Sequence, residues 1–471
     1  MICDIYSSGI NVGKLIIIAA LICIGGTSLP LAATAQEKEE PKSGSLNLDM
    51  EQAVKLGLEQ NPRIKGMEHG IESSQSAVKS ARGGFLPKLS AGYSRTYMDN
   101  ISAEGPTDDD YLDQTQDQWR VSLVQTLFAG KTILNTYQKA QIEKEASRLE
   151  KQKAEMDLIR QIQEEFLKYL KVREDRRSLE DTIRRLQVGR EAAQAFVSKK
   201  MAPFVDVLQA EVELEDARQE LSKVQNEEQI HKMRLNAFLG LQKQRHVTYS
   251  GDLADIDLEI DLELEKCIEL AKEQRVELQF ILNNIQIASK ERDIAQGRKW
   301  PTVNLELSAI DRSQDYDAKG SRTNPMTGET QTYDRDRENQ YWTAGINVEW
   351  EFFSGGEQHY QAESMEYEIK KLQRIYEDDL NNILTEVQGA HLRLQEARSR
   401  VDASMGAVET ARENYDMQEE RFKRQVASVQ ELLDAQANLT RAEANSNQAR
   451  LDFQLALSEL YSAMGEKEFD L

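Results

Sequence analysis

Three acidic residues that directly follow two short interruptions of long helical segments are the side chains best placed to do chemistry. Asp206 comes after KKMAPFV, and Glu431 and Asp434 come after RQVASVQ. Residues 431 and 434 are one helical turn apart, so their carboxylates share one face of a helix. Such carboxylates can attract or repel ions, and in a first helical turn they also complement the helix dipole. From these residues alone, the helix-dipole interpretation is the stronger one.

Other reactive groups are sparse along the chain. The five histidines are scattered, with no cysteine or carboxylate at metal-ligand spacing. No nucleophile motif and no phosphate-binding glycine loop is present. Outside the N-terminal segment the single cysteine is Cys267, where a buried apolar side chain is expected. We therefore expect no enzyme activity, no metal site and no cofactor.

The composition favours long charged helices over a large globular core. The 471 residues are 39% hydrophobic and 30% charged, with only 8 prolines. The net charge of -22 makes nucleic acid an improbable partner, because phosphates would be repelled.

The N-terminus has the features of a secretory signal. Lys14 precedes the apolar run LIIIAALICIGG, and SLPLAATA then ends in small residues. The run is too short for a transmembrane helix. We expect a signal peptide over 1–35, cleaved after Ala35, and a linker over 36–45. An acylated N-terminus is not expected, because Ile22 precedes Cys23 where a lipoprotein signal has a small residue.

The sequence is a tandem duplication. AVKLGLEQNPRI starting at 53 aligns with CIELAKEQRVEL starting at 267, an offset of 267 − 53 = 214. VLQAEVEL starting at 207 aligns with LLDAQANL starting at 432, an offset of 432 − 207 = 225. Two constant offsets separated by one insertion indicate two repeats. The repeats span 46–241 and 261–465, with a linker over 242–260 and a tail over 466–471.

Each repeat contains two segments in which apolar and polar residues alternate. We expect hairpins over about 86–128 and 301–353, with polar, acidic loops at 97–116 and 311–340. Aromatic residues near the segment ends and a polar opposite face are typical of transmembrane β-barrel strands. Arg95 and Gln125 fall on the apolar face and are expected near a rim. A solvated hairpin is the alternative.

Long helices follow the hairpins. We expect long helices over 131–198 and 356–424, and return helices over 204–239 and 429–464. The second return helix has a heptad seam of small and apolar residues. Its counterpart has Glu228 and His231 in that seam. An ordinary coiled-coil rod would explain the heptads but not the strands.

A chain with these elements must close its sheet with further copies of itself. An open sheet would expose unpaired backbone N–H and C=O groups to hydrocarbon, at several kcal/mol each. Bacterial barrels begin at about eight strands, so two copies would give a filled barrel and three a pore. The helices would then form a second barrel, with the two tips about 100 Å from the membrane.

The chain resembles the TolC-like outer-membrane factor (outer-membrane efflux protein) family over about 46–465. The resemblance is carried by the tandem repeat and by NPRI, FLPKL, LFAGK, FFSGG, VDVLQA and VQELLDA. It implies a mostly α fold with a small β part. Four transmembrane β-strands and long antiparallel coiled-coil helices would form a homotrimeric β-barrel/α-barrel tube. Such a protein lies in the outer membrane of a Gram-negative bacterium, contacts its lipid and extends helices into the periplasm.

The resemblance also implies a function and partners. The family forms the exit duct of tripartite efflux pumps and type I secretion systems and is not enzymatic. It conducts substrates passively from an inner-membrane pump of the RND, ABC or MFS type through a periplasmic adaptor (membrane fusion) protein. The alternatives are a periplasmic coiled-coil structural or adaptor protein, and a nutrient porin, which four strands disfavour.

Site residues are carried over by motif. The resemblance makes Asp206, Glu431 and Asp434 the constriction at the periplasmic mouth, where a trimer would present rings of three carboxylates. The chain departs from the family at Lys200 and Gln425, where glycine is usual, and at Ala427, where the best-known member has an arginine. Arg424 and Lys200 are candidate substitutes for that arginine. The expected adaptor-contacting tips are Lys200, Met201, Ala202, Pro203, Gln425, Val426, Ala427 and Ser428.

Overall fold

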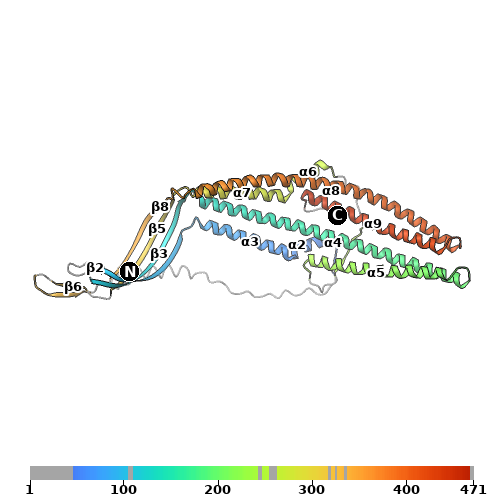
Figure 1. Ribbon diagram of the computed structural model, residues 1–471, viewed down its shortest axis with the longest axis horizontal. Coiled ribbons are helices and arrows are strands. Elements are labelled where there is room, and N and C mark those ends of the chain that lie inside the picture. The colour runs from blue at the N-terminus through green and yellow to red at the C-terminus, as the bar shows by residue number, and fades with distance from the viewer. Residues whose placement is uncertain are drawn as a thin grey trace, which may run out of the picture. The chain divides into compact units, whose positions relative to one another are not determined.

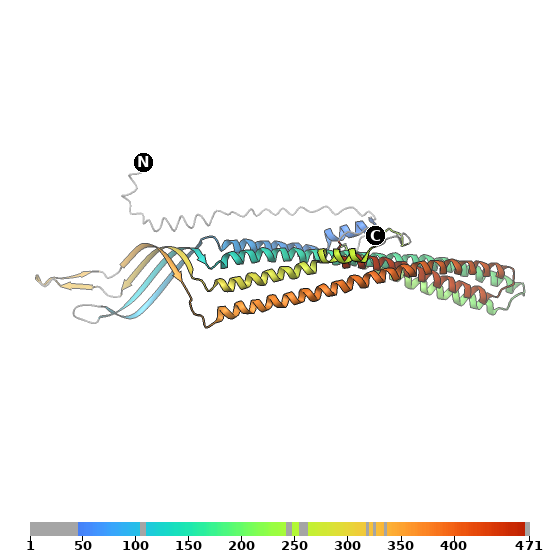
Figure 2. The same cartoon turned by 90° about the horizontal axis from the view of Figure 1, so that it is seen from above.

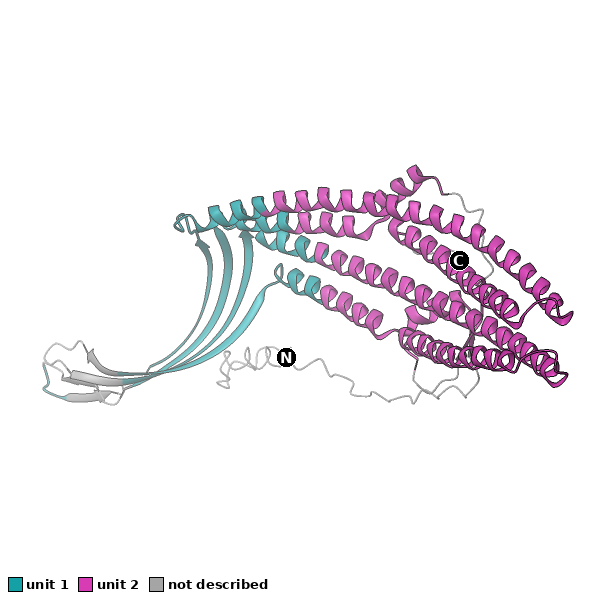
Figure 3. Cartoon of the chain, turned by 45° about the vertical axis from the view of Figure 1, so that its right-hand side comes forward, with its two compact units in different colours: residues 1–39, 76–141, 288–367 teal, residues 40–75, 142–287, 368–471 magenta. Residues whose placement is uncertain are grey.

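The structure is a computed structural model that describes residues 46–103, 110–241, 247–253, 262–316, 320–323, 326–333 and 337–466. The expected signal peptide, the N-terminal linker, much of the inter-repeat linker and nearly all of the C-terminal tail lie outside the described residues. The chain forms two compact units (Figure 3). One unit holds the sheet and the adjoining helix ends, and the other holds the remaining helices.

A four-stranded antiparallel sheet is built from both repeats in the order β2-β3-β5-β8. Its strands are β2 (Lys88–Ala103), β3 (Asp110–Ala129), β5 (Thr302–Tyr316) and β8 (Arg337–Glu349). Two smaller sheets pair β6 (Gly320–Thr323) with β7 (Thr330–Tyr333), and β1 (Leu46–Leu48) with β4 (Val247–Tyr249). The main strands run further into the expected polar loops than the alternation indicated, because the backbone ladder continues past the apolar residues.

The two faces of the main sheet differ as the alternation predicted. On the apolar face the rings of Tyr93 and Trp119 are 4.8 Å apart, and Ile346 is 67% exposed. On the polar face the hydroxyls of Ser122 and Ser308 are 2.9 Å apart. A single chain therefore leaves an apolar sheet face uncovered, which is unfavourable in water.

The two polar residues on the apolar face both have partners. Arg95 lies 3.7 Å from Asp117, its register neighbour on β3. Gln125 donates to the carbonyl of Phe85 at 3.3 Å and to that of Thr126 at 2.9 Å. These contacts compensate for polar groups among apolar neighbours.

Eight helices occupy the described residues outside the sheets. Their bounds are α2 (Met50–Gln60), α3 (Pro62–Gly83), α4 (Thr132–Ser198), α5 (Val205–Phe238), α6 (Leu264–Gln274), α7 (Val276–Gly297), α8 (Glu357–Lys423) and α9 (Val429–Met464). Among the described helices, none has the length and apolar character needed to cross a membrane. In the helical unit the hairpins α4–α5 and α8–α9 lie side by side in both views (Figures 1 and 2).

The duplication is visible in the lengths and starts of two helix pairs. Helices α4 and α8 both have 67 residues, and their starts differ by 357 − 132 = 225. Helices α3 and α7 both have 22 residues, and their starts differ by 276 − 62 = 214. The structure therefore confirms both offsets.

The same junction occurs once in each repeat, where a return helix ends against the break between two short helices. Gly240 (φ 66) and Gly465 (φ 83) are both left-handed, and an added Cβ would lie 2.8 Å and 3.0 Å from the backbone of residues 60 and 274. Asn61 donates to the Phe238 carbonyl at 2.8 Å. Its repeat equivalent Arg275 donates to the Ala463 carbonyl at 3.2 Å. The backbone conformation and the close approach together require glycine.

The heptad seam is buried, and the polar exceptions in it are paired. In α9 the seam residues Leu439, Phe453 and Leu460 are at most 2% exposed. In α5, Glu228 pairs with Arg176 of α4 at 2.9 Å. His231 contacts Glu165 of α4 at 2.8 Å. Charged partners on α4 thus explain why this seam tolerates two polar residues. Cys267 is buried as expected, at 1% exposed.

Candidate functional site

Both tips turn with the same backbone motif. In the first tip the N–H of Lys200 donates to Val197 and that of Met201 to Phe196, each at 2.9 Å. In the second tip Gln425 and Val426 make the equivalent bonds to residues 422 and 421, also at 2.9 Å. This pair of hydrogen bonds is a Schellman motif, which ends a helix with one left-handed residue.

The left-handed residue of each motif is not glycine. Lys200 has φ 54 and Gln425 has φ 62, and they correspond by the offset of 225. A side chain in this conformation costs about 1–2 kcal/mol relative to glycine. The two positions at which the sequence departs from the family glycine are therefore the two positions that the turn strains.

The second tip starts its return helix with a capping box. The Ser428 hydroxyl accepts from the Glu431 N–H at 3.2 Å, and the Glu431 carboxylate accepts from the Ser428 N–H at 2.7 Å. In the first tip the equivalent positions are Pro203 and Asp206, and Phe204 precedes α5 without a side-chain cap. The pattern Ser-x-x-Glu was readable in the sequence and explains how the second tip starts a helix without proline.

The three candidate gate acids have different environments. Hydrogen bonds from Ser428 hold the pKa of Glu431 below its usual value, so this carboxylate has a structural role in the cap. Asp434 is exposed and accepts a 2.8 Å bond from Gln430. Among the described residues, the half-buried Asp206 carboxylate has no hydrogen-bond or ion-pair partner. Of the three candidate gate acids, Asp206 and Asp434 therefore contribute least to the local structure of the tips.

The tip residues form one exposed surface. Gln425 contacts the sulfur of Met201 at 3.8 Å, which places the two tips next to each other. Exposure is 54% for Met201, 58% for Phe204 and 63% for Val426. Ala202 and Ala427 are half-buried, and the other expected tip residues are exposed: Lys200, Pro203, Gln425 and Ser428.

An aromatic core supports the tips from behind. The rings of Phe196 and Phe422 pack edge to face at 5.4 Å. Buried Val207 of α5 and Leu432 of α9 belong to the same cluster. Both hairpins therefore share one core at their tips.

Arg421 is a cation whose charge acts on Glu431, and it is not among the residues that the motif comparison indicated. Arg421 contributes to lowering the pKa of Glu431 and donates to the Val426 carbonyl at 3.4 Å. Arg424, the candidate substitute, lies 3.7 Å from Glu420 instead.

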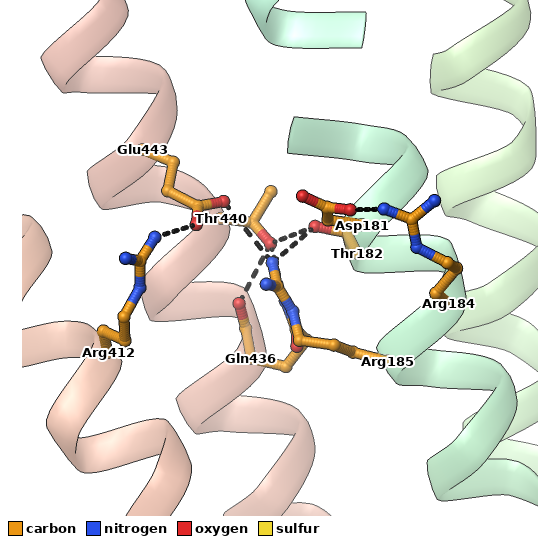
Figure 4. A network of polar contacts seen from close by, with 8 residues as sticks. All are labelled: Asp181, Thr182, Arg184, Arg185, Arg412, Gln436, Thr440 and Glu443. Atoms are coloured by element: carbon orange, nitrogen blue, oxygen red, sulfur yellow. Dashed lines mark hydrogen bonds and ion pairs between the residues drawn. The ribbon is translucent and has the colours of Figure 1, made fainter. Parts of the chain in front are cut away.

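A polar network joins the two hairpins farther from the tips (Figure 4). Arg185 of α4 donates to Gln436 at 2.9 Å and to Glu443 at 3.4 Å, both on α9. Its guanidinium also lies 5.6 Å from the ring centre of Tyr415 on α8. Burial is the main cause that raises the pKa of Tyr415 to about 12. No local sequence pattern indicates this network, because Arg185 and its α9 partners are about 250 residues apart.

These features define a class of protein. A duplicated chain with an open-edged sheet, an exposed apolar sheet face and paired helical hairpins is one segment of the wall of a membrane channel. The chain belongs to the outer membrane efflux protein family, which it matches over residues 53–241 and 267–466. Membership confirms the outer-membrane localisation, with the helical part in the periplasm, and the expected TolC-like resemblance.

Solved channel structures share the fold. The chain is 15% identical to the CmeC outer membrane channel of Campylobacter jejuni, with a TM-score of 0.73 over 94% of this chain and 95% of that one. It is 16% identical to the outer membrane protein VceC of Vibrio cholerae, with a TM-score of 0.70 over 88% of this chain and 96% of that one. It is 15% identical to the Neisseria gonorrhoeae MtrE outer membrane channel in its open state, with a TM-score of 0.65 over 89% of each chain. No curated protein matches the sequence.

Proposed function

We propose that three copies of this chain form the outer-membrane exit duct of a tripartite efflux or type I secretion system. Substrates would come from an inner-membrane pump of the RND, ABC or MFS type through a periplasmic adaptor protein. Conduction is passive and involves no catalytic step. Membership of an efflux-channel family and the TolC-like fold support this proposal.

The observation that carries the proposal is the pair of free sheet edges. In the order β2-β3-β5-β8, the strands β2 and β8 each have one neighbour in the main sheet among the described residues. Their outward backbone groups need partners if the sheet is to lie in hydrocarbon. Copies of the same chain can supply them, because β8 of one copy can pair with β2 of the next and close the ring.

The apolar face is nearly as tall as the apolar band of an outer-membrane barrel. Trp342 at the start of the apolar run and Trp350 just after β8 are both exposed and eight residues apart. That spacing is about 27 Å along a strand, or about 20 Å along the membrane normal at the ~40° tilt of barrel strands. The apolar band of outer-membrane barrels is about 25 Å tall.

The tips are proposed to meet the adaptor and to form the gate. Exposed Met201, Phe204 and Val426 offer apolar contacts to a partner. Asp206 and Asp434 would face the pore and repel each other across it, so that their rings favour cations and resist closure unless counter-charged. Glu431 would contribute mainly by fixing the start of α9.

Three measurements test the duct. After a carbonate wash of membranes, the protein should remain in the outer-membrane fraction, and the purified protein in planar bilayers should show single-channel steps. Cells lacking the chain should become sensitive to detergents or drugs, or lose secretion of one protein. A protein released by the wash would instead favour the periplasmic structural or adaptor alternative, and normal tolerance together with normal secretion would also contradict the duct.

A further inference from the structure

Three arginines lie on the polar face of the main sheet, in the half that is farther from the helices. Arg120 of β3 is the register partner of Ile310 on β5, and Arg312 lies two residues further along β5. Arg337 of β8 is the register partner of Gln314, which is again two residues beyond Arg312. Diagonal neighbours of this kind are about 7–8 Å apart, within reach of long side chains. The three arginines therefore form one diagonal row across three adjacent strands.

Hydrogen bonds and register place the whole row on the polar face. Arg312 donates through Nε and Nη2 to Oε1 of Gln118 on β3, at 3.2 Å and 3.0 Å. Arg120 lies two residues from Gln118, and Arg337 lies two residues from Asn339, the register partner of Arg312. Alternate residues of a strand face the same side, and so do register partners. All three arginines therefore share the face of Gln118.

The row has no acidic neighbour on its own face. Among the described residues of these strands, the acids of the polar face are Glu306 and Glu349, and both lie nearer to the helices than the row does. Lys88 lies at the level of Glu306. In the outer half of the sheet, the described acids all alternate onto the apolar face: Asp117, Asp311, Asp315 and Glu338. The outer half of the polar face is therefore purely cationic in the part that the structure describes.

The acids of the apolar face interact with neighbours on that face. Asp117 accepts from the Tyr93 hydroxyl at 2.6 Å and lies 3.7 Å from Arg95. Asp311 accepts from Gln340 at 3.3 Å. The backbone layer of the sheet separates these carboxylates from the arginines of the polar face. They therefore do not compensate the charge of the row.

The guanidinium groups of the row keep free hydrogen-bond donors. Arg120 and Arg337 are exposed, and among the described residues neither has a hydrogen-bond or ion-pair partner. Arg312 uses Nε and Nη2 for Gln118, which leaves Nη1. Guanidinium groups bind carboxylate, sulfate and phosphate oxygens through paired N–H donors. A cluster of unpaired cations in a chain of net charge -22 is therefore suited to an anionic ligand.

We propose that Arg120, Arg312 and Arg337 form a cationic belt in the lumen of the duct, and that this belt binds the anionic groups of small organic anions as they leave. The inference rests on the proposed function, because only a closed ring of copies makes the polar face the wall of a lumen. Each copy contributes three arginines. The belt extends from the level of Ile310 to that of Gln314, which is about 14 Å along a strand and about 10 Å along the membrane normal at a ~40° tilt.

The belt has the opposite sign to the acids at the tips. An anion that a pump has driven past Asp206 and Asp434 gains favourable interactions at the belt, and the tip acids oppose its return to the periplasm. Because Arg120 and Arg337 are exposed to water, the anion is held weakly enough to leave. The two charged regions in series therefore favour outward movement of anionic cargo.

A charge-removing and a charge-keeping double variant test the belt in planar bilayers. Arg120→Gln with Arg337→Gln removes two arginines that have no partner among the described residues, so folding should be unaffected. It should lower the chloride-to-potassium permeability ratio by about twofold or more, read from the reversal potential in a potassium chloride gradient. Arg120→Lys with Arg337→Lys keeps the charge and should retain the wild-type ratio. Arg95→Gln is the matched control, because it removes an arginine at a neighbouring level of the apolar face and should leave the ratio unchanged.

Block of the channel by anions tests binding directly. Inorganic tripolyphosphate and the organic anion naphthalenetrisulfonate, each added on the side of the strand loops, should reduce the single-channel current of the wild type. In Arg120→Gln with Arg337→Gln the half-blocking concentration of both anions should rise by about tenfold or more, because two of the three cations per copy are lost. Arg95→Gln should keep the wild-type values. Block by tripolyphosphate alone would restrict the belt to inorganic anions and overturn its assignment to organic cargo.

The outcomes separate the inference from the proposed function. A single-chain mass in detergent, or the absence of single-channel steps, would contradict the duct itself. Normal steps with an unchanged permeability ratio and unchanged block in Arg120→Gln with Arg337→Gln would overturn the belt and leave the duct intact. Equal effects of the double variant and of Arg95→Gln would overturn the assignment of the row to the lumen.

Discussion

Lys200 and Gln425 show how single residues set the properties of the tips. Each has positive φ at the end of a long helix, in a Schellman motif that favours glycine. A strained residue at both tips lowers the stability of the region that is proposed to contact another protein.

Replacing either residue by glycine should stabilise the protein. For Lys200→Gly and Gln425→Gly we expect about 0.5–1 kcal/mol of added unfolding free energy per site, because relief of left-handed strain exceeds the added freedom of the unfolded chain. Thermal unfolding followed by circular dichroism in detergent measures this change. Lys79→Gly, at an exposed position inside α3, should instead cost about 1 kcal/mol. Destabilisation by both tip substitutions would contradict the strain.

Glu431 should make stability depend on pH. Its pKa is lowered in the folded protein, so its contribution is present above the unfolded value of 4.5 and is lost as the pH falls through the folded value. We expect the melting temperature of the wild type to exceed that of Glu431→Gln at pH 6 and the difference to shrink towards pH 3. A difference that is constant over this range would contradict the capping role of the charge.

The gate acids should control ion selectivity. Asp206→Ala with Asp434→Ala should raise single-channel conductance and weaken cation selectivity in planar bilayers, because the carboxylate rings would be lost. Glu51→Ala with Glu269→Ala removes two exposed acids from α2 and α6 and should leave both properties unchanged. Unchanged selectivity in the first double variant would remove these residues from the pore mouth.

At the scale of elements, the repeated junction determines how the short and return helices meet. Gly240 ends α5 against the break between α2 and α3, and Gly465 ends α9 against the break between α6 and α7. A hydrogen bond from Asn61 or Arg275 closes each junction. The pattern LG and MG in the two repeats therefore marks a packing requirement.

Substitution of the junction glycine should be costly. In Gly240→Ala the added Cβ would lie 2.8 Å from the Gln60 carbonyl oxygen at φ 66, so we expect a loss of at least about 1–2 kcal/mol of unfolding free energy. Gly66→Ala is the matched control, because no atom lies within 4 Å of its added Cβ inside α3. The control should gain up to about 1 kcal/mol. Equal melting temperatures for the two variants would contradict the junction.

At the scale of the whole molecule, one chain is an incomplete structure. In the part of the chain that the structure describes, the main sheet has two edge strands with one neighbour each and an uncovered apolar face. Further copies and lipid would cover these surfaces, which is why the duct is proposed as a trimer in the outer membrane.

A charge should impair membrane assembly on the apolar face of the sheet but not on the polar face. Ile346→Arg places a charge within the apolar band and should cost about 2–4 kcal/mol, and so reduce the amount of protein in the outer membrane. Asn347→Arg alters the adjacent residue on the polar face and should assemble normally. Quantification of washed outer-membrane fractions measures both. Normal assembly of Ile346→Arg would contradict the lipid-facing assignment.

Much of the fold was predictable from local pattern. Alternation of apolar and polar residues predicted the strands, and heptads predicted the return helices. Two constant offsets predicted the duplication, and α4 and α8 have equal lengths and starts that differ by one of these offsets. Such patterns are set by the periods of strand and helix, which act within a few residues. The Ser-x-x-Glu pattern of Ser428 and Glu431 is also present in the sequence, but only the structure shows that its hydrogen bonds start the return helix of the second tip.

Only the tertiary structure showed which distant side chains meet. Arg185 donates to Gln436 and Glu443, and Arg275 donates to the Ala463 carbonyl. The charged partners of the α5 seam lie on α4. These contacts depend on the relative rotation and register of helices that are far apart in the chain, and no local period determines either. The sequence alone determined a duplicated wall segment, whereas packing decided that its two hairpins are held together by buried polar contacts.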